Sequence, residues 1–150
     1  MADTQAEPRP LLPNLKSFYD FAIPLAWPVI RIACGWNLMI HGWGKVTRGP
    51  SAYIKGFNDQ GFDPALPWIW AALGIEFVGG IALILGLFTR FFAAAAAIEM
   101  AIISYLYWKN GFGWLNRGYE YTLLWGWVCF AIALRGGGPY SVDRAIGKEL

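Results

Sequence analysis

The sequence predicts an all-α, polytopic membrane protein built as a bundle of four transmembrane helices. Hydrophobic residues make up 57% of its 150 residues and charged residues 15%, against about a half and a quarter in ordinary soluble domains. The apolar residues form four long, continuous runs, which favours helices over the alternating strands of a membrane barrel. The net charge is only +2 and no basic cluster is present, so we expect no nucleic-acid partner.

The four apolar runs have about the length that a bilayer requires. A helix needs roughly 20 mainly apolar residues to cross the hydrocarbon core. We predict spans over about 22–42, 66–87, 91–107 and 119–135. The loops between them are too short to fold alone, so residues 1–150 form one domain, with residues 1–20 and 136–150 as extramembrane ends.

Two connections carry structural information of their own. Residues 88–90 are so short a link that the second and third spans must form an antiparallel hairpin. The longer link between the first and second spans contains Tyr53, Ile54 and Phe57 at helical spacing. This pattern predicts a short amphipathic helix that lies in the membrane interface.

The orientation follows from the even number of spans, which places both termini on one side. The first apolar run is too long for a signal peptide, and no cleavage site follows it. We expect a multi-pass protein of the bacterial inner membrane with cytoplasmic termini, because basic residues slightly favour that side. The termini side carries Arg9, Lys16, Arg90, Arg135, Arg144 and Lys148, and the opposite side carries Lys45, Arg48, Lys55, Lys109 and Arg117.

Three charged residues lie near the centres of the predicted spans: Arg31, Glu76 and Glu99. A charge at the bilayer centre costs at least about 2.5 kcal/mol, so such residues are normally paired or functional. If each span is centred on the midplane, the three share one layer. We predict an intramembrane ion pair between Arg31 and Glu76, which either fixes the helix register or organises a polar pocket. Glu99 is then a surplus carboxyl, which we expect to be neutral.

Small residues on the first two spans predict close helix packing. We expect the packing positions to be Gly35, Ala72, Gly79 and Gly80. The two cysteines, Cys34 and Cys129, fall on opposite sides of the midplane when each span is centred, so we expect buried free thiols and no disulfide between them.

A second set of polar residues is expected near the side of the membrane opposite the chain termini. Aromatic residues are concentrated there, either as an interface belt or as the mouth of a site for a ring-bearing ligand. His41 is the only histidine and either carries protons or is a structural residue. Candidate catalytic residues are His41, Glu76 and Glu120. Candidate pocket residues are Asn37, His41, Lys45, Glu99, Glu120 and Trp127.

The motifs also limit the cofactors. One histidine excludes bis-histidine haem, and no flavin, nicotinamide, iron–sulfur or metal motif is present. We therefore expect no metal and no covalently bound cofactor, with a quinone as the candidate ligand.

Several local patterns resemble the DoxX-like (DoxX/DoxD) family of membrane proteins. They are Arg31 followed by His41-Gly42-x-x-Lys45, then Gly74-x-Glu76-x-x-Gly79-Gly80, Gly86-Leu87-x-Thr89-Arg90 and the tail Gly136-Gly137-Gly138-Pro139-Tyr140-Ser141-Val142-Asp143. Glu99 departs from the family pattern, in which an apolar residue is usual at this position. The resemblance implies a four-helix protein of the inner membrane. Some relatives belong to a thiosulfate:quinone oxidoreductase, and others accompany membrane redox or thiol-stress systems.

Three functions remain open from the sequence. The first is a subunit of a respiratory or sulfur/thiol redox system with a quinone-facing pocket, which would need a redox partner to act as an oxidoreductase. The second is a non-catalytic subunit that anchors a larger membrane complex. The third is a transporter of a small solute, which would require an oligomer because four helices leave little lumen. The expected partners are the bilayer with other membrane subunits or further copies of the chain.

Overall fold

The computed structural model describes residues 11–150, and the part of the predicted extramembrane end before residue 11 lies outside them. The described residues form helices and loops, without strands. The main helices are α1 (Lys16–Arg48), α3 (Ala65–Leu73), the π-helical turn η3 (Gly74–Val78), α4 (Gly79–Leu85), α5 (Thr89–Leu106) and α6 (Glu120–Arg135). The short helices are α2 (Ile54–Asp59), α7 (Val142–Ile146) and 3₁₀ turns at Pro13–Leu15, Pro50–Tyr53, Trp108–Asn110 and Trp114–Asn116.

Three helical segments are long and apolar enough to cross a membrane. They are Pro13–Arg48, Ala65–Leu85, which comprises α3, η3 and α4, and Thr89–Leu106. The first segment contains the first predicted span, and the other two agree with the second and third predicted spans to within two residues. The fourth predicted span is present as α6, whose 16 residues extend about 24 Å at 1.5 Å per residue. Its crossing of the membrane stays a prediction, as does the interfacial location of α2.

Helix α1 is longer than the predicted span over 22–42. It contains 33 residues and extends about 50 Å, well beyond the thickness of a hydrocarbon core. Polar residues at its first turn support the extension, because Lys16 and Asp20 form an i,i+4 ion pair of 2.7 Å. Helix α1 therefore begins six residues before the predicted span, and the location of residues up to 20 outside the membrane stays a prediction.

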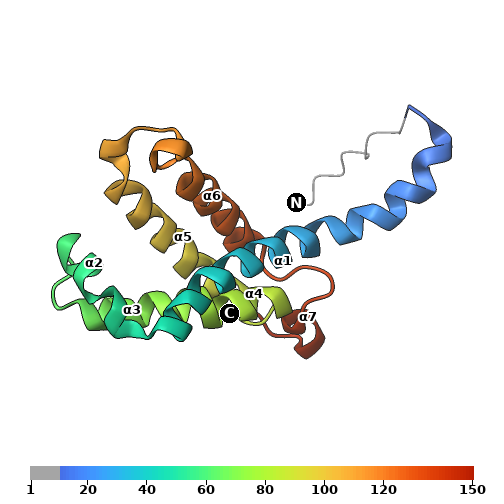
Figure 1. The fold of residues 1–150 in the computed structure, drawn as a ribbon. Coiled ribbons are helices and arrows are strands. Elements are labelled where there is room, and N and C mark those ends of the chain that lie inside the picture. Colours follow the sequence, from blue (N-terminus) through green and yellow to red (C-terminus); the bar gives the residue numbers. More distant parts are fainter. Residues whose placement is uncertain (1–10) are drawn as a thin grey trace.

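The long helices form two layers that cross one another (Figure 1). In the first layer, α1 packs along η3 and α4; in the second, α5 packs along α6. Toward the α2 end the α5–α6 pair leans away from α1 and α3, so that the layers diverge (Figure 1). The core lies at the crossing and consists of Cys34, Leu38, Leu83, Ala93, Ala96, Met100, Cys129 and Ile132.

Glycines set the register of α1 against the antiparallel α4 and η3. A Cβ added at Gly80 would lie 2.6 Å from the amide nitrogen of Met39 and 2.7 Å from the carbonyl oxygen of Gly35. A Cβ at Gly42 would lie 2.4 Å from the amide nitrogen of Phe77. The backbones therefore touch where the side chains are absent, which is how small residues allow close helix approach.

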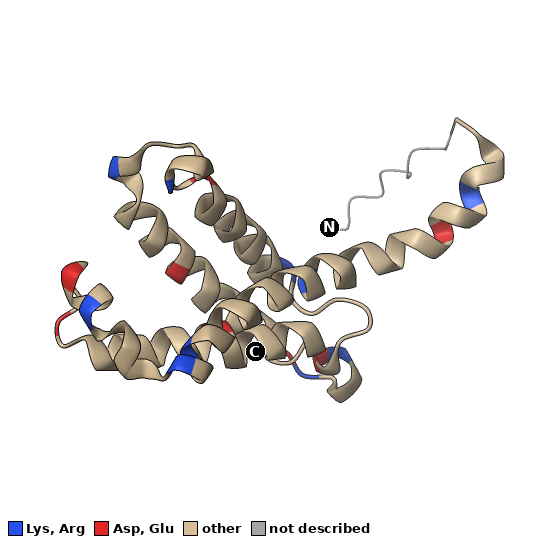
Figure 2. Cartoon of the chain, viewed as in Figure 1, with Lys and Arg blue, Asp and Glu red and all other residues tan. Residues whose placement is uncertain are grey.

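The outer surfaces of the helices are apolar, as contact with lipid requires. Charged residues stand mainly in loops and toward helix ends, while long stretches of each helix carry none (Figure 2). Large apolar side chains that the protein leaves uncovered include Val29, Ile32, Val78, Ile98, Leu124 and Leu134.

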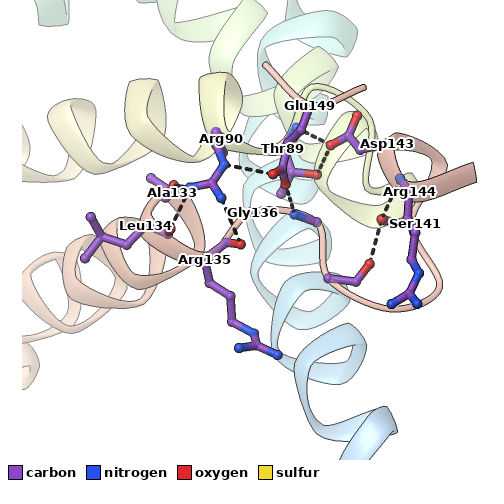
Figure 3. Close-up of polar contacts among 12 residues, drawn as sticks. Thr89, Arg90, Ala133, Leu134, Arg135, Gly136, Ser141, Asp143, Arg144 and Glu149 are labelled. Atoms are coloured by element: carbon purple, nitrogen blue, oxygen red, sulfur yellow. Dashed lines mark hydrogen bonds and ion pairs between the residues drawn. The ribbon is translucent and has the colours of Figure 1, made fainter. Parts of the chain in front are cut away.

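The C-terminal segment 136–150 ties the helices together at one end of the molecule (Figure 3). Arg90 donates hydrogen bonds to the last carbonyl groups of α6, at Ala133, Leu134 and Arg135, and forms an ion pair of 2.9 Å with Glu149. These contacts satisfy carbonyl oxygens that a helix C-terminus leaves without intrahelical partners.

Candidate functional site

Two neighbouring cavities lie where the layers diverge. The first, which we call the His41 cavity, has a volume of about 220 Å³ and lies between α1 and the α5–α6 pair. The second, the Lys45 cavity, has a volume of about 430 Å³ and lies between α5 and the α2–α3 region. Glu76, Ile103 and Tyr107 border both cavities. The site is therefore one divided space, with Glu76 on the shared wall.

The His41 cavity has apolar walls and a few polar groups. Leu38, Met100, Ile103 and Trp125 supply apolar surface. The Asn37 amide donates a hydrogen bond of 2.5 Å to the Tyr121 hydroxyl across the cavity wall. His41 borders the cavity and remains exposed, and no described residue hydrogen-bonds to its imidazole ring. Its ring nitrogens are free to bind a ligand.

The Lys45 cavity is bordered by a buried ion pair. Lys45 Nζ contacts Glu76 Oε2, and the two side chains are only 12% and 8% exposed. Lys45 also lies over the ring of Tyr53, 5.6 Å from its centroid. Glu99 borders the same cavity, and its buried Oε2 has no hydrogen-bond partner among the described residues. The cavity therefore holds one neutralised carboxylate and one carboxyl group without a partner.

The backbone at Glu76 departs from a regular α-helix. Residues Gly74–Val78 form the π-helical turn η3 between α3 and α4. Such turns insert an extra residue into the helical repeat and are frequent at functional sites. Gly74, the first residue of this turn, has open space around its Cβ position.

The predicted ion pair between Arg31 and Glu76 is not formed. Arg31, which is 1% exposed, instead donates hydrogen bonds to the carbonyl oxygens of Gly137 at 2.5 Å and Tyr140 at 3.0 Å. A Cβ at Gly86 would lie 2.4 Å from Arg31 Nη1, so Arg31 lies beside the end of α4. Glu76 is ten positions earlier, about 15 Å along the helix. Centring each span on the midplane misplaced Arg31, because α1 is longer than the span.

Other candidate residues lie outside the two cavities. Glu120 accepts a hydrogen bond of 3.2 Å from the amide of Trp114 in its own loop, so it is not joined to Asn37, His41 and Lys45. Trp127 borders a separate groove on the outer face of α5 and α6, because α6 turns it away from α1.

The predicted packing positions divide into three groups. Gly35 and Gly80 meet at the α1–α4 crossing, and Gly79 faces Phe92 of α5. Ala72 instead borders the Lys45 cavity.

The two cysteines lie together, contrary to the expectation from the sequence. Cys34 Sγ and Cys129 Sγ are 3.3 Å apart, and both residues are fully buried free thiols on the wall of the His41 cavity. The error again came from the assumed depth of α1. Sequence reasoning counted Tyr107 and Tyr121 among the aromatic residues of an interface belt or ligand mouth, but it did not separate these two, which line the His41 cavity, from the rest. Across residues 11–150, no three His, Cys, Asp or Glu side chains form a metal-binding group.

The motifs that surround this space, from α1 through η3 to the start of α5, also decide the family. The model of the DoxX family matches residues 26–108. The chain belongs to the DoxX family. Arg31, His41, Lys45, Glu76 and Arg90 all lie within the DoxX match.

Two curated proteins cover most of this DoxX-family chain. The inner membrane protein YqjF of Escherichia coli (strain K12) is 32% identical over 126 residues, which are 81% of this chain and 92% of the relative. An uncharacterized protein of Haemophilus influenzae (strain ATCC 51907 / DSM 11121 / KW20 / Rd) is 32% identical over 140 residues, which are 91% of this chain and 98% of the relative. No solved structure matches the chain.

Proposed function

We propose that this protein is a membrane subunit of a redox system and binds a quinone head group in the His41 cavity. A quinone ring has apolar faces and two carbonyl oxygens that accept hydrogen bonds. The His41 cavity combines apolar walls with the uncommitted imidazole of His41, and this combination carries the proposal. Small-molecule sites have this composition, with mostly apolar walls and a few polar groups that orient the ligand.

The neighbouring polar groups suit the same ligand. His41 and Tyr107, whose side chains can donate hydrogen bonds, both line the cavity. Glu76 lies on the wall between the cavities and is held by Lys45, which neutralises its charge. In the proposal His41 binds a quinone carbonyl group, and Glu76 supports proton exchange with the Lys45 cavity.

The proposal also covers location and partners. The subunit lies in the bacterial inner membrane with both termini in the cytoplasm, and it works beside another protein. The sequence contains no flavin, nicotinamide or iron–sulfur motif, so a partner protein delivers the electrons.

The decisive experiment is the extraction of lipids from protein purified in mild detergent, with quantification of quinone per chain. We expect quinone to accompany the wild-type protein and to be lost in His41→Leu. Trp36→Leu is the matched control, because Trp36 lies on α1 outside both cavities. The proposal fails if the wild-type protein carries no quinone and added decylubiquinone does not bind to it.

A second candidate function is a structural subunit that docks another membrane helix. The outer groove on α5 and α6 has a volume of about 580 Å³, and small residues allow a helix to approach closely. Its small lining residues are Ala94, Ala97, Ala101, Gly126 and Ala133. Enlarging Ala101 to phenylalanine should then release a partner without loss of quinone, which native electrophoresis and quinone extraction would measure separately.

A further inference from the structure

We propose that Cys34 and Cys129 form a dithiol–disulfide centre that transfers two electrons to a quinone in the His41 cavity. The inference rests on the proposed function, because it assigns a chemical role to the same cavity. It differs in placing a redox-active group within this chain rather than only in a partner.

The geometry of the two thiols carries the proposal. The two Sγ atoms are 3.3 Å apart, whereas a disulfide bond is about 2.04 Å long. Closing the difference requires a shift of roughly 1.3 Å, shared between the two side chains. Oxidation can therefore join the sulfurs without separating the helices that carry them.

The position of the pair in the fold argues against simple core filling. Cys34 belongs to α1 and Cys129 to α6, so the thiols meet across the two layers. Neighbouring Gly35 packs against the backbone at Gly80, which fixes Cys34 at the layer crossing. Both cysteines are also on the wall of the His41 cavity. Two facing thiols beside a cavity can exchange electrons with its occupant.

The reaction balances without a further reagent. Each thiol loses its proton and the pair loses two electrons, while the sulfurs form one S–S bond. The quinone accepts the two electrons and, in total, two protons, and becomes a quinol. In the proposal the imidazole of His41 and the carboxylate of Glu76, both on the cavity wall, exchange protons with the quinone oxygens.

The direct test counts free thiols in the full chain after exposure to a quinone. The chain contains only two cysteines, so maleimide labelling after denaturation reports this pair alone. Protein purified under reducing conditions and then freed of reductant under argon is mixed with decylubiquinone, quenched with acid and labelled. Intact mass spectrometry counts the labels, and absorbance measures quinol.

We expect the wild-type protein to lose both labelled thiols, to lose two hydrogen atoms in mass and to form one quinol per chain. Cys34→Ser should retain its remaining thiol and form no quinol. His41→Leu keeps both thiols, so diamide should still oxidise the pair, whereas decylubiquinone should oxidise it more slowly. This difference separates a cavity-dependent reaction from oxidation in solution.

The contrary outcomes are distinguishable. Bound decylubiquinone with both thiols still labelled would overturn the redox role of the cysteines and leave the quinone site intact. A quinone adduct mass in place of a two-hydrogen loss would also overturn it. Failure of decylubiquinone to bind, measured by tryptophan fluorescence, with thiols unchanged would overturn both proposals. Formation of the disulfide with diamide but not with quinone would overturn the electron transfer.

Discussion

Asp143 holds the first turn of α5 through Thr89. Asp143 Oδ2 accepts hydrogen bonds from the Thr89 amide at 2.9 Å and from the Thr89 hydroxyl at 2.7 Å, while Oδ1 accepts one from the Phe88 amide at 2.7 Å. Both residues of the pair are buried. A residue of the C-terminal segment therefore supplies the acceptors that the first amides of a helix otherwise lack.

Replacing Asp143 with alanine should destabilise the protein more than a surface change would. A hydrogen bond to a charged group contributes about 1.5–3 kcal/mol, and the substitution also leaves buried donors without partners. We expect a clear fall in the thermal unfolding midpoint in detergent. Asp59→Ala is the control, because its ion pair with Lys55 is exposed. Equal midpoints for the two variants would contradict the capping role.

Arg31→Lys should loosen the C-terminal segment despite keeping the charge. The planar guanidinium reaches two carbonyl oxygens, at Gly137 and Tyr140, whereas a lysine ammonium cannot reproduce that fork geometry. We expect faster cleavage at Arg144 and Lys148 by trypsin. Arg48→Lys, at the exposed end of α1, should leave the cleavage rate unchanged.

Gly80→Ala should disturb the crossing of α1 and α4. The added methyl group would meet backbone atoms of Gly35 and Met39 that cannot turn aside. Overpacking of this kind costs about 1–3 kcal/mol, read as a lowered unfolding midpoint. Gly74→Ala is the matched control, because its Cβ would meet open space. A tolerated alanine at Gly80 would show that the helices are farther apart than described.

The Lys45–Glu76 pair should show strong coupling in a double-mutant cycle. Removing one partner of a buried ion pair costs about 3–5 kcal/mol, because the other charge is left uncompensated. Lys45→Met or Glu76→Met alone should therefore destabilise the protein more than the double variant does. The exposed Lys55–Asp59 pair should give a coupling energy below about 1 kcal/mol. If the double variant lost as much stability as the two single variants together, the result would exclude a buried ion pair.

Glu99→Leu should stabilise the protein. The buried Oε2 atom has no hydrogen-bond partner among the described residues, and such an atom costs about 1–3 kcal/mol. We expect a higher unfolding midpoint for this variant. Glu120→Leu should instead lower the unfolding midpoint, because Glu120 accepts a hydrogen bond from the Trp114 amide. A lower midpoint for Glu99→Leu would indicate a partner that the fold does not reveal.

The helical part of the fold could be predicted from the sequence because hydrocarbon-length apolar runs have one main solution in lipid. The runs 66–87 and 91–107 lie within two residues of the observed Ala65–Leu85 and Thr89–Leu106. The first run predicted the bounds of its helix less well, because apolar content does not show how far a helix extends beyond the membrane into polar surroundings. Helix α1 begins at Lys16 and ends at Arg48. The residues beyond the predicted span are compatible both with a helical backbone and with contact with water.

The pairings within the site could not be predicted for the same reason. The sequence analysis correctly expected a cation beside Glu76 but chose Arg31 instead of Lys45. It did so because it took the depth of each residue in the membrane from the centre of its predicted span. The true register depends on which backbones touch, and Gly35 and Gly80 fix it. The error that separated Glu76 from Lys45 also separated Cys34 from Cys129. The observed position of α1 brings Lys45 to the level of Glu76 and Arg31 to the level of Gly86.

The C-terminal segment has a consequence for the order of assembly. Asp143 and Glu149 bind Thr89 and Arg90 at the start of α5, and Glu149 also accepts a hydrogen bond from the Gly137 amide just after α6, yet both residues are synthesised after these helices. The contacts between α1 and α4 and between α5 and α6 can therefore form while the chain is being made, and the contacts of the C-terminal segment are the last to be added.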